Sequence, residues 1–336
     1  MFRGREVYMK NCWCGNKLEK MYSQHYYVCD GCHTLVSDVE FTENILHIKD
    51  EEKDLYGKNY WEEMMCRLSG KKNLDEIIDY YLQERTLYWI QYILKYRLPE
   101  ATIAEIGAGL GQMLYLVKQA GYQEVGFELS KEICEYNKKT LGVNMYQGDI
   151  SETDNKFDII MAFDLLEHII DPGEFVKRCT EHLTNNGIFC IQTPCYNEEW
   201  TYDEMLGKAP RFKNLLTEFQ HIHLFSRKSI EKLLREQGFE YINFEPAVFG
   251  DDYDMFVFAS KTPMKQNTEE EINVYLNSIP AGRMIKSMIS LYTQVNEKQK
   301  VIDELVAYKN YLESKEVQNN PVEKKSLLGK LGLKRE

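Results

Sequence analysis

Residues 103–114, IAEIGAGLGQML, place a short apolar run directly before a glycine-rich turn. Glu105 lies inside this run. Gly107, Gly109 and Gly111 then follow at every second position. A turn of this kind at the end of a strand brings backbone N–H groups and a helix N-terminus against a nucleotide-like ligand. The stretch therefore predicts a strand, a ligand-binding turn and a helix, in this order.

Strand-like and helix-like segments alternate from residue 101 to residue 262. The expected strands are Thr102–Ile106, Glu124–Glu128, Val143–Gln147, Phe157–Phe163 and Gly187–Thr193, followed by a hairpin of two strands in 240–249 and 253–261. The expected helices are Gly111–Ala120, Lys131–Leu141, Gly173–Leu183 and one that has Ser226 as its N-cap and ends at Gly238. Alternation with short connections predicts a doubly wound, mostly parallel sheet of the α/β class.

An amphipathic pattern precedes this region. In residues 73–99 the apolar side chains recur at steps of three and four, which is typical of a helix with one buried face. Asn73 or Asp75 is the expected N-cap, and Pro99 ends the helix. We expect residues 46–100 to form a linker and this helix, which leans on the sheet.

The glycine spacing G-x-G-x-G, with Glu105 before it, resembles motif I of class I S-adenosylmethionine-dependent methyltransferases. VGFELS carries Glu128 and QGDI carries Asp149, at positions that resemble the second and third cofactor motifs of this family. FDIIMAFDLLEHIIDP and HLFSRKSIEKLLREQGF resemble two further segments that recur in it. The resemblance covers roughly residues 56–261 and implies a seven-stranded, Rossmann-like methyltransferase sheet. A nicotinamide oxidoreductase is disfavoured by the glycine spacing.

The resemblance also implies how the cofactor binds. Glu105 would oppose the ammonium group of S-adenosylmethionine, Glu128 would bind both ribose hydroxyls, and Asp149 would contact the adenine amino group. The residues expected to bind the cofactor are Glu105, Gly107, Ala108, Gly109, Gly111, Glu128, Leu129, Asp149, Ile150 and Phe163.

Methyl transfer requires a base only if the acceptor is a hydroxyl or a carbon acid. The candidate bases are His168, His221 and His223. Asp164 and Glu167 are carboxylates near the end of the fourth strand. The alternative role of these residues is to orient the loop, to line the site or to pack.

Aromatic and acidic residues are frequent between Pro194 and His221. Tyr196, Trp200 and Tyr202 are candidates for stacking on a sugar or aromatic ring of the acceptor. A plain surface loop is the alternative interpretation of this segment.

Four cysteines near the N-terminus have the spacing of a metal site. Cys12, Cys14, Cys29 and Cys32 form two pairs, and four thiolates suit tetrahedral zinc. The first pair is C-x-C rather than C-x-x-C, so His33 is an alternative ligand. An iron–sulfur cluster is the other metal interpretation. We expect residues 1–45 to form a zinc ribbon with a structural metal that supplies the folding energy of the module.

Composition excludes several function classes. The 336 residues carry a formal net charge of −12 and no basic patch in the central region, which disfavours nucleic acid as a partner. No apolar run approaches the length of a membrane span. Nine cysteines without a secretion signal favour reduced thiols, so we expect a cytoplasmic protein.

The C-terminal region is polar and helical. Residues 263–316 are expected to be helical, continuously from residue 269, and to be followed by a basic flexible tail in 317–336. A heptad seam, interrupted by two lysines, is formed by Leu291, Val295, Ile302, Leu305 and Leu312. This seam favours either a coiled-coil homodimer or a helix that folds back on its own domain.

A zinc ribbon joined to such a methyltransferase domain resembles a bacterial group that includes sugar methyltransferases and enzymes of surface-glycan pathways. The resemblance implies transfer of a methyl group to a small-molecule acceptor, a sugar or a glycan precursor. The alternatives are a non-catalytic scaffold that retains the cofactor fold and a protein methyltransferase.

Overall fold

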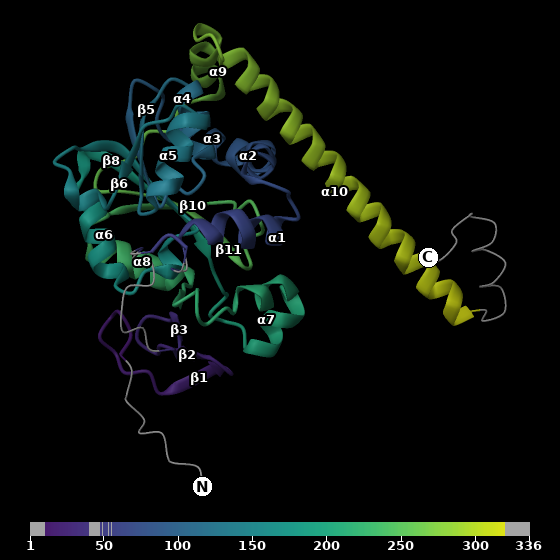
Figure 1. Cartoon of the computed structure of the whole chain (residues 1–336). Helices are drawn as coiled ribbons and strands as arrows, with labels where there is room; N and C mark the ends of the chain where they lie inside the picture. Colours follow the sequence, from purple (N-terminus) through teal and green to yellow (C-terminus); the bar gives the residue numbers. More distant parts are fainter. Residues whose placement is uncertain (1–10, 40–47, 49, 53, 55, 320–336) are drawn as a thin grey trace. The chain divides into compact units, whose positions relative to one another are not determined.

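The computed structural model describes residues 11–39, 48, 50–52, 54 and 56–319 (Figure 1). The chain divides into two units, residues 1–285 and 286–336, and each is described by itself. No helix in the described ranges is long and apolar enough to cross a membrane.

A seven-stranded sheet forms the centre of the first unit. Its strand order is β10-β11-β8-β7-β4-β5-β6, and β11 runs antiparallel to both of its neighbours while the other pairs are parallel. The strands are β4 (Thr102–Ile106), β5 (Gln123–Glu128), β6 (Met145–Gln147), β7 (Phe157–Phe163), β8 (Leu183–Pro194), β10 (Tyr241–Glu245) and β11 (Asp254–Ser260). The expected α/β methyltransferase sheet is confirmed, including the final hairpin.

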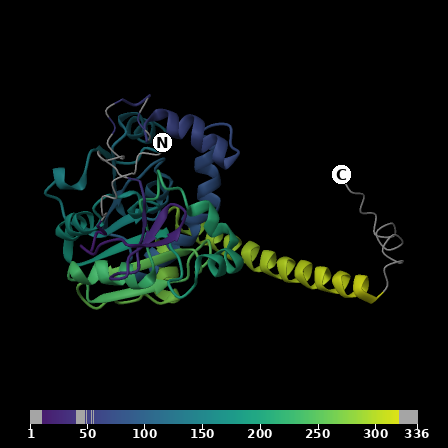
Figure 2. The same cartoon turned by 90° about the horizontal axis from the view of Figure 1, so that it is seen from below.

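Helices cover both faces of this sheet, as Figures 1 and 2 show. The rings of Phe256 and Phe258 on β11 contact Tyr92 and Tyr96 of α3, whereas Val257 between them packs in the cluster that holds the apolar side chains of α6 and α8. The helices of this region are α2 (Leu74–Gln83), α3 (Arg85–Tyr96), α4 (Gln112–Gln119), α5 (Lys131–Thr140), α6 (Pro172–Glu181) and α8 (Arg227–Glu236). Burial on both faces explains why these strands are almost continuously apolar.

The helix expected in residues 73–99 is broken, so the prediction of a single helix was wrong. Asn73 caps α2 as expected, because its side chain accepts a hydrogen bond from Glu76 N at 2.9 Å. The chain leaves the helical region at Glu84, where ψ is −99°. The break coincides with Arg85, whose guanidinium lies 4.3 Å from the centre of the Tyr81 ring and donates to Asp164 at 2.6 Å.

The prediction of a continuous helix from residue 269 was also wrong. This region consists of α9 (Glu269–Ser278) and α10 (Gly282–Asn319). Pro280 lies between them, and proline interrupts the hydrogen bonding of a helix. The five seam residues of α10 are exposed, as an unpaired coiled-coil helix requires. The basic tail lies almost entirely outside the described residues.

A second, four-stranded sheet joins the N-terminal region to the region of the seven-stranded sheet. Its order is β1 (Lys20–Ser23), β2 (Tyr26–Val28), β3 (Leu35–Ser37) and β9 (His223–Leu224), with all pairs antiparallel. Shorter helical segments are η1 (Tyr60–Met65), α1 (Cys66–Ser69), η2 (Ile150–Glu152), η3 (Leu166–His168), α7 (Tyr202–Lys208) and η4 (Pro210–Leu215).

Replacing Gly126 with alanine tests the packing of β5 against α4. A Cβ at Gly126 would lie 2.4 Å from Leu114 Cδ1 and 2.8 Å from Ala108 Cβ. We expect Gly126→Ala to lower the free energy of unfolding by about 1–3 kcal/mol, as overpacking does. Gly207→Ala is the control, because nothing lies within 4 Å of its Cβ position in α7 and alanine favours a helix. Equal stability of the two variants in chemical denaturation would contradict this packing.

Candidate functional site

The glycine turn lies between β4 and α4, at the carboxyl end of the sheet. Gly107, Gly109 and Gly111 all have positive φ angles, of 66°, 50° and 69°, which residues with a side chain rarely adopt. A Cβ on Gly109 would lie 2.6 Å from Trp61 Cη2, so this glycine is also required by a close approach. The predicted glycine turn is therefore present, with Gly107 exposed and Gly109 and Gly111 buried.

Glu128 at the tip of β5 is the nearest charged neighbour of this turn. One carboxylate oxygen accepts from Gly109 N at 3.0 Å, and the other accepts from Leu129 N at 2.8 Å and Ser130 N at 3.0 Å. Burial raises the pKa of Glu128, while these backbone N–H groups favour its charged form. The carboxylate is thus held rigidly beside the turn.

A cavity opens where these elements meet. It is lined by Ile48, Tyr56, Tyr60, Trp61, Ile106, Gly107, Phe127, Glu128, Leu129, Gly148, Asp149, Asp164, Leu165, His168, Ile169, Phe175 and Arg178. Of the predicted cofactor residues, the lining includes Gly107, Glu128, Leu129 and Asp149. It does not include Glu105, Ala108, Gly109, Gly111, Ile150 and Phe163. The cofactor roles of all ten stay predictions.

Glu105 is a buried acid behind the turn. One of its carboxylate oxygens has no hydrogen-bond partner among the described residues. Burial raises its pKa to about 8. A buried oxygen without a partner is costly, and an incoming ammonium group would relieve that cost.

The residues at the cavity fit S-adenosylmethionine. Glu128 would offer its remaining acceptor capacity to the ribose hydroxyls, and Asp149 would offer an oxygen to an adenine amino group. Leu165, Ile169 and Phe175 supply apolar surface for the adenine ring. The glycine turn leaves room for close approach of the methionine part.

Three aromatic residues at the cavity were not predicted as site residues. Tyr56, Tyr60 and Trp61 line it from the segment that precedes α1, and their rings contact one another in sequence. The aromatic residues of YGKNYW (56–61) are the only local signal for them. They cover the cavity and would exclude water from it.

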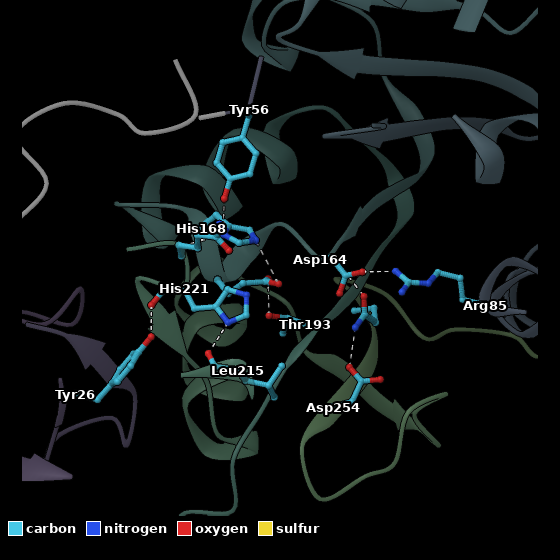
Figure 3. Close-up of polar contacts among 12 residues, drawn as sticks. Tyr26, Tyr56, Arg85, Asp164, His168, Thr193, Leu215, His221 and Asp254 are labelled. Carbon is cyan, nitrogen blue, oxygen red and sulfur yellow. Dashed lines mark hydrogen bonds and ion pairs between the residues drawn. The ribbon is translucent and has the colours of Figure 1, made fainter. Parts of the chain in front are cut away.

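Two of the candidate bases lie together with a carboxylate. One ligand atom from each of Glu167, His168 and His221 lies within 4.8 Å of the others, and His168 Nε2 is 3.7 Å from a Glu167 oxygen. The rings of His168 and His221 are 5.0 Å apart, and they lie side by side in Figure 3. We call these three residues the acid–base cluster. His168, which belongs to this cluster, also lines the cavity described above, which we call the cofactor cavity.

Backbone carbonyls fix the protonation of both rings. His168 Nδ1 lies 2.8 Å from Gln220 O, and His221 Nδ1 lies 2.7 Å from Leu215 O. Because a carbonyl only accepts, each Nδ1 carries the proton and each neutral Nε2 keeps a lone pair. Burial lowers the pKa of both histidines.

The carboxylate of the cluster is also perturbed. Burial raises the pKa of Glu167 to about 7, although its other oxygen accepts from Thr193 Oγ1 at 2.9 Å. A carboxyl that titrates near neutrality beside two neutral imidazoles can exchange protons with them.

The structure places His223 outside the cofactor cavity and pairs Asp164 with an arginine. His223 Nδ1 lies 3.0 Å from Ile169 O, and its side chain lines another cavity, beside Cys12 and Trp13. Asp164 lines the cofactor cavity, but its carboxylate accepts from Arg85 at 2.6 Å (Figure 3).

None of the aromatic residues predicted to bind the acceptor lines the cofactor cavity. Tyr196 is buried, and its hydroxyl donates to His33 O at 2.7 Å. Its ring packs edge-on against Tyr22, which also contacts Tyr202. Stacking on an acceptor stays a prediction, which this packing does not support for Tyr196.

The four N-terminal cysteines converge. Their sulfur atoms lie within 4.8 Å of one another, with Cys12–Cys32 and Cys14–Cys29 each at 3.5 Å. Tetrahedral zinc with bonds of about 2.3 Å spaces its sulfurs by roughly 3.8 Å, so the arrangement fits zinc. His33 is not part of this cluster. Zinc itself stays a prediction.

Replacing Glu128 tests the cofactor assignment. We expect Glu128→Ala to weaken S-adenosylmethionine binding at least about tenfold, because two charge-assisted hydrogen bonds to the ribose are lost. Isothermal titration calorimetry measures the affinity. Glu132→Ala, an exposed glutamate on the neighbouring helix α5, is the control and keeps the parental affinity. Unchanged affinity in Glu128→Ala would remove Glu128 from the site.

Comparison with known proteins places this region in a family. A model described as "Methyltransferase domain" matches residues 78–243. A ubiquinone biosynthesis O-methyltransferase of Bradyrhizobium diazoefficiens is 29% identical over 105 residues, which are 29% of this chain and 41% of that protein. Another, from Rhodopseudomonas palustris, is 27% identical over 103 residues, covering 29% of this chain and 40% of the relative. The chain thus spans about two fifths of these relatives.

Solved structures with a similar arrangement include two methyltransferases. One is an S-adenosylmethionine-dependent methyltransferase of Thermotoga maritima, with a TM-score of 0.42 and 20% identity over 56% of this chain and 95% of that one. The other is magnesium protoporphyrin IX methyltransferase of Synechocystis, with a TM-score of 0.44 and 14% identity over 63% of this chain and 100% of that one. Residues 78–243 of this chain thus match the methyltransferase-domain family and form an S-adenosylmethionine-dependent methyltransferase domain.

Proposed function

We propose that the chain transfers the methyl group of S-adenosylmethionine to a hydroxyl oxygen of a small-molecule acceptor. The observation that carries this proposal is the position of the acid–base cluster, because His168 lines the cofactor cavity while Glu167 and His221 lie directly behind it. A hydroxyl acceptor must lose a proton, and this cluster supplies a buried base at that point.

The proposed reaction gives specific roles to His168, Glu167 and the three aromatic residues of the cavity. S-adenosylmethionine supplies an electrophilic methyl group, whose bond to sulfur breaks as a bond to the acceptor oxygen forms. His168 Nε2 takes the hydroxyl proton, and Glu167 stabilises the charged imidazole from 3.7 Å. Tyr56, Tyr60 and Trp61 keep water away from the reacting atoms.

The curated relatives support an oxygen acceptor through their names, which describe O-methyltransferases. A sugar or glycan precursor is the finer part of our proposal and rests on the resemblance of the cysteine module and methyltransferase domain to such enzymes. A homodimer through α10 and a cytoplasmic location also stay proposals.

Transfer of radiolabelled methyl groups tests the function. The purified chain and labelled S-adenosylmethionine are added to an extract of the source cells, which is fractionated into nucleotide-sugars, other small molecules, polysaccharide and protein. We expect label in the small-molecule or carbohydrate fractions. Gly109→Arg is the control. The arginine side chain would collide with Trp61, which packs against the glycine turn, and would block the site. Label in protein alone, or none despite cofactor binding, would contradict the proposal.

The pH dependence follows from the cluster. Protonated Glu167 cannot stabilise an imidazolium, and its pKa is raised to about 7, so activity is lost as the pH falls through that value. We expect kcat/KM for the acceptor to rise between about pH 5.5 and about 8 and then to level off. Glu167→Gln removes this rise and lowers the plateau by about 10²–10⁴-fold. A flat profile for the parent, or an unchanged rise in Glu167→Gln, would exclude Glu167 from this role.

A further inference from the structure

The N-terminal cysteine module reaches the acid–base cluster through its strands. Tyr26 of β2 is fully buried, and its hydroxyl donates to the backbone oxygen of His221 at 2.8 Å (Figure 3). The same histidine directs its ring nitrogen Nδ1 to Leu215 O. One end of His221 is therefore held by the module and the other by the methyltransferase domain.

Strand pairing holds the rest of this segment. β3 pairs with β9, with Leu35 opposite Leu224 and Val36 opposite His223. Ser37 N donates to Ile222 O at 2.9 Å, and Ser37 Oγ donates to Glu218 O at 2.7 Å. The backbone oxygens that accept hydrogen bonds from the module in these contacts belong to Glu218, His221 and Ile222. We call residues 217–224 the His221 segment.

The module and the methyltransferase domain also share one apolar core. It contains Tyr26 and Leu35 from the module, Leu224 from the His221 segment, and Tyr196, Met205, Ala209 and Phe212 from the insertion after β8. Tyr196 adds a hydrogen bond to His33 O, next to Cys32. The module is thus packed as part of the domain wall rather than as a separate appendage.

The cysteines fix the turn that carries these contacts. Cys29 directly follows β2, and two residues separate Cys32 from the start of β3. Apart from the shared core, the apolar cluster of the module consists mainly of Cys12, Leu18, Cys29, Cys32 and Val36. With so little apolar surface of its own, the module depends on metal–thiolate bonds to hold β2 and β3 in register.

Resting on the proposed function, we infer that the four-cysteine module is a positioning element for the acceptor chemistry: the metal-bound module holds His221 in the acid–base cluster through Tyr26 and the β3–β9 pairing. We expect binding of S-adenosylmethionine to be independent of this contact, because Glu128 is held by Gly109 N of the glycine turn and by Leu129 N, both outside the module. The module therefore controls turnover and leaves cofactor affinity unchanged.

A pair of tyrosine variants tests the contact without disturbing the packing. Tyr26→Phe removes the hydrogen bond to His221 and keeps the buried ring. Tyr22→Phe is the matched control, because its hydroxyl is buried without a hydrogen-bond partner in the described part of the chain. We expect Tyr26→Phe to lower kcat by about two- to tenfold, the effect of one lost hydrogen bond, with an unchanged affinity for S-adenosylhomocysteine. Tyr22→Phe stays at the parental values.

The pKa of His221 is a second measurement. It would stay unchanged if Tyr26 only stabilised the fold. Burial lowers its pKa in the parent. In Tyr26→Phe the ring resonances of His221 should titrate closer to the ordinary histidine value, because the segment loosens and water reaches the ring. The Tyr22→Phe resonances should titrate as in the parent.

Removal of the metal tests the whole module in the full-length chain. The zinc content of the purified protein is measured before and after treatment with a chelator, and in Cys29→Ser. We expect hydrogen exchange in residues 217–224 to become faster and turnover to fall about 100-fold, with S-adenosylhomocysteine binding within about twofold of the parent. The retained binding of S-adenosylhomocysteine distinguishes a loss of positioning from general unfolding.

Two outcomes would overturn the inference. The first is parental kcat and parental exchange of residues 217–224 after metal loss. The second is loss of cofactor binding in step with turnover, which would make the module a general stabiliser. If the parent transfers no methyl group, the proposed function fails, while the exchange and titration experiments still decide whether the module holds His221.

Discussion

Burial of a parallel sheet on both faces is the constraint on which the rest of this structure depends. Parallel strands end at one edge, so β4, β5 and β7 deliver their last residues to the same place. The glycine turn, Glu128 and Asp164 follow those three strands and meet at one cavity. A helix layer on each face leaves this edge as the place where loops gather, and the acid–base cluster lies there as well.

The electrostatics of this edge favour a cationic ligand. Glu105, Glu128 and Glu167 are all buried, and burial raises the pKa of each. Asp254 behind them has a pKa raised to about 7 for the same reason, and it accepts from Gln192 at 2.7 Å. S-adenosylmethionine carries a sulfonium and an ammonium group, whose positive charge would lower the cost of keeping these acids ionised. A bound cofactor cation would thus favour the ionised form of these acids.

Local patterns predicted the central sheet well. The bounds of β4 and β7 agree with the expectation because both are short apolar runs between polar residues. The N-caps Asn73 and Ser226 are local features that residue type alone determines. The break at Glu84 coincides with contacts of Arg85 to Asp164, 79 positions away in the sequence, which no local pattern indicates. His221 and His223 are two positions apart, and only tertiary packing shows that one joins the cluster while the other lines a separate cavity.

The pairing of β3 with β9 has a consequence for how the protein is made. Leu35 leaves the ribosome early, whereas its partner Leu224 is added only after most of the methyltransferase domain has been synthesised. Until then the nascent cysteine module lacks its fourth strand and most of its apolar core. The predicted zinc would therefore be bound either by a module whose strands are not yet all paired or only after that interval.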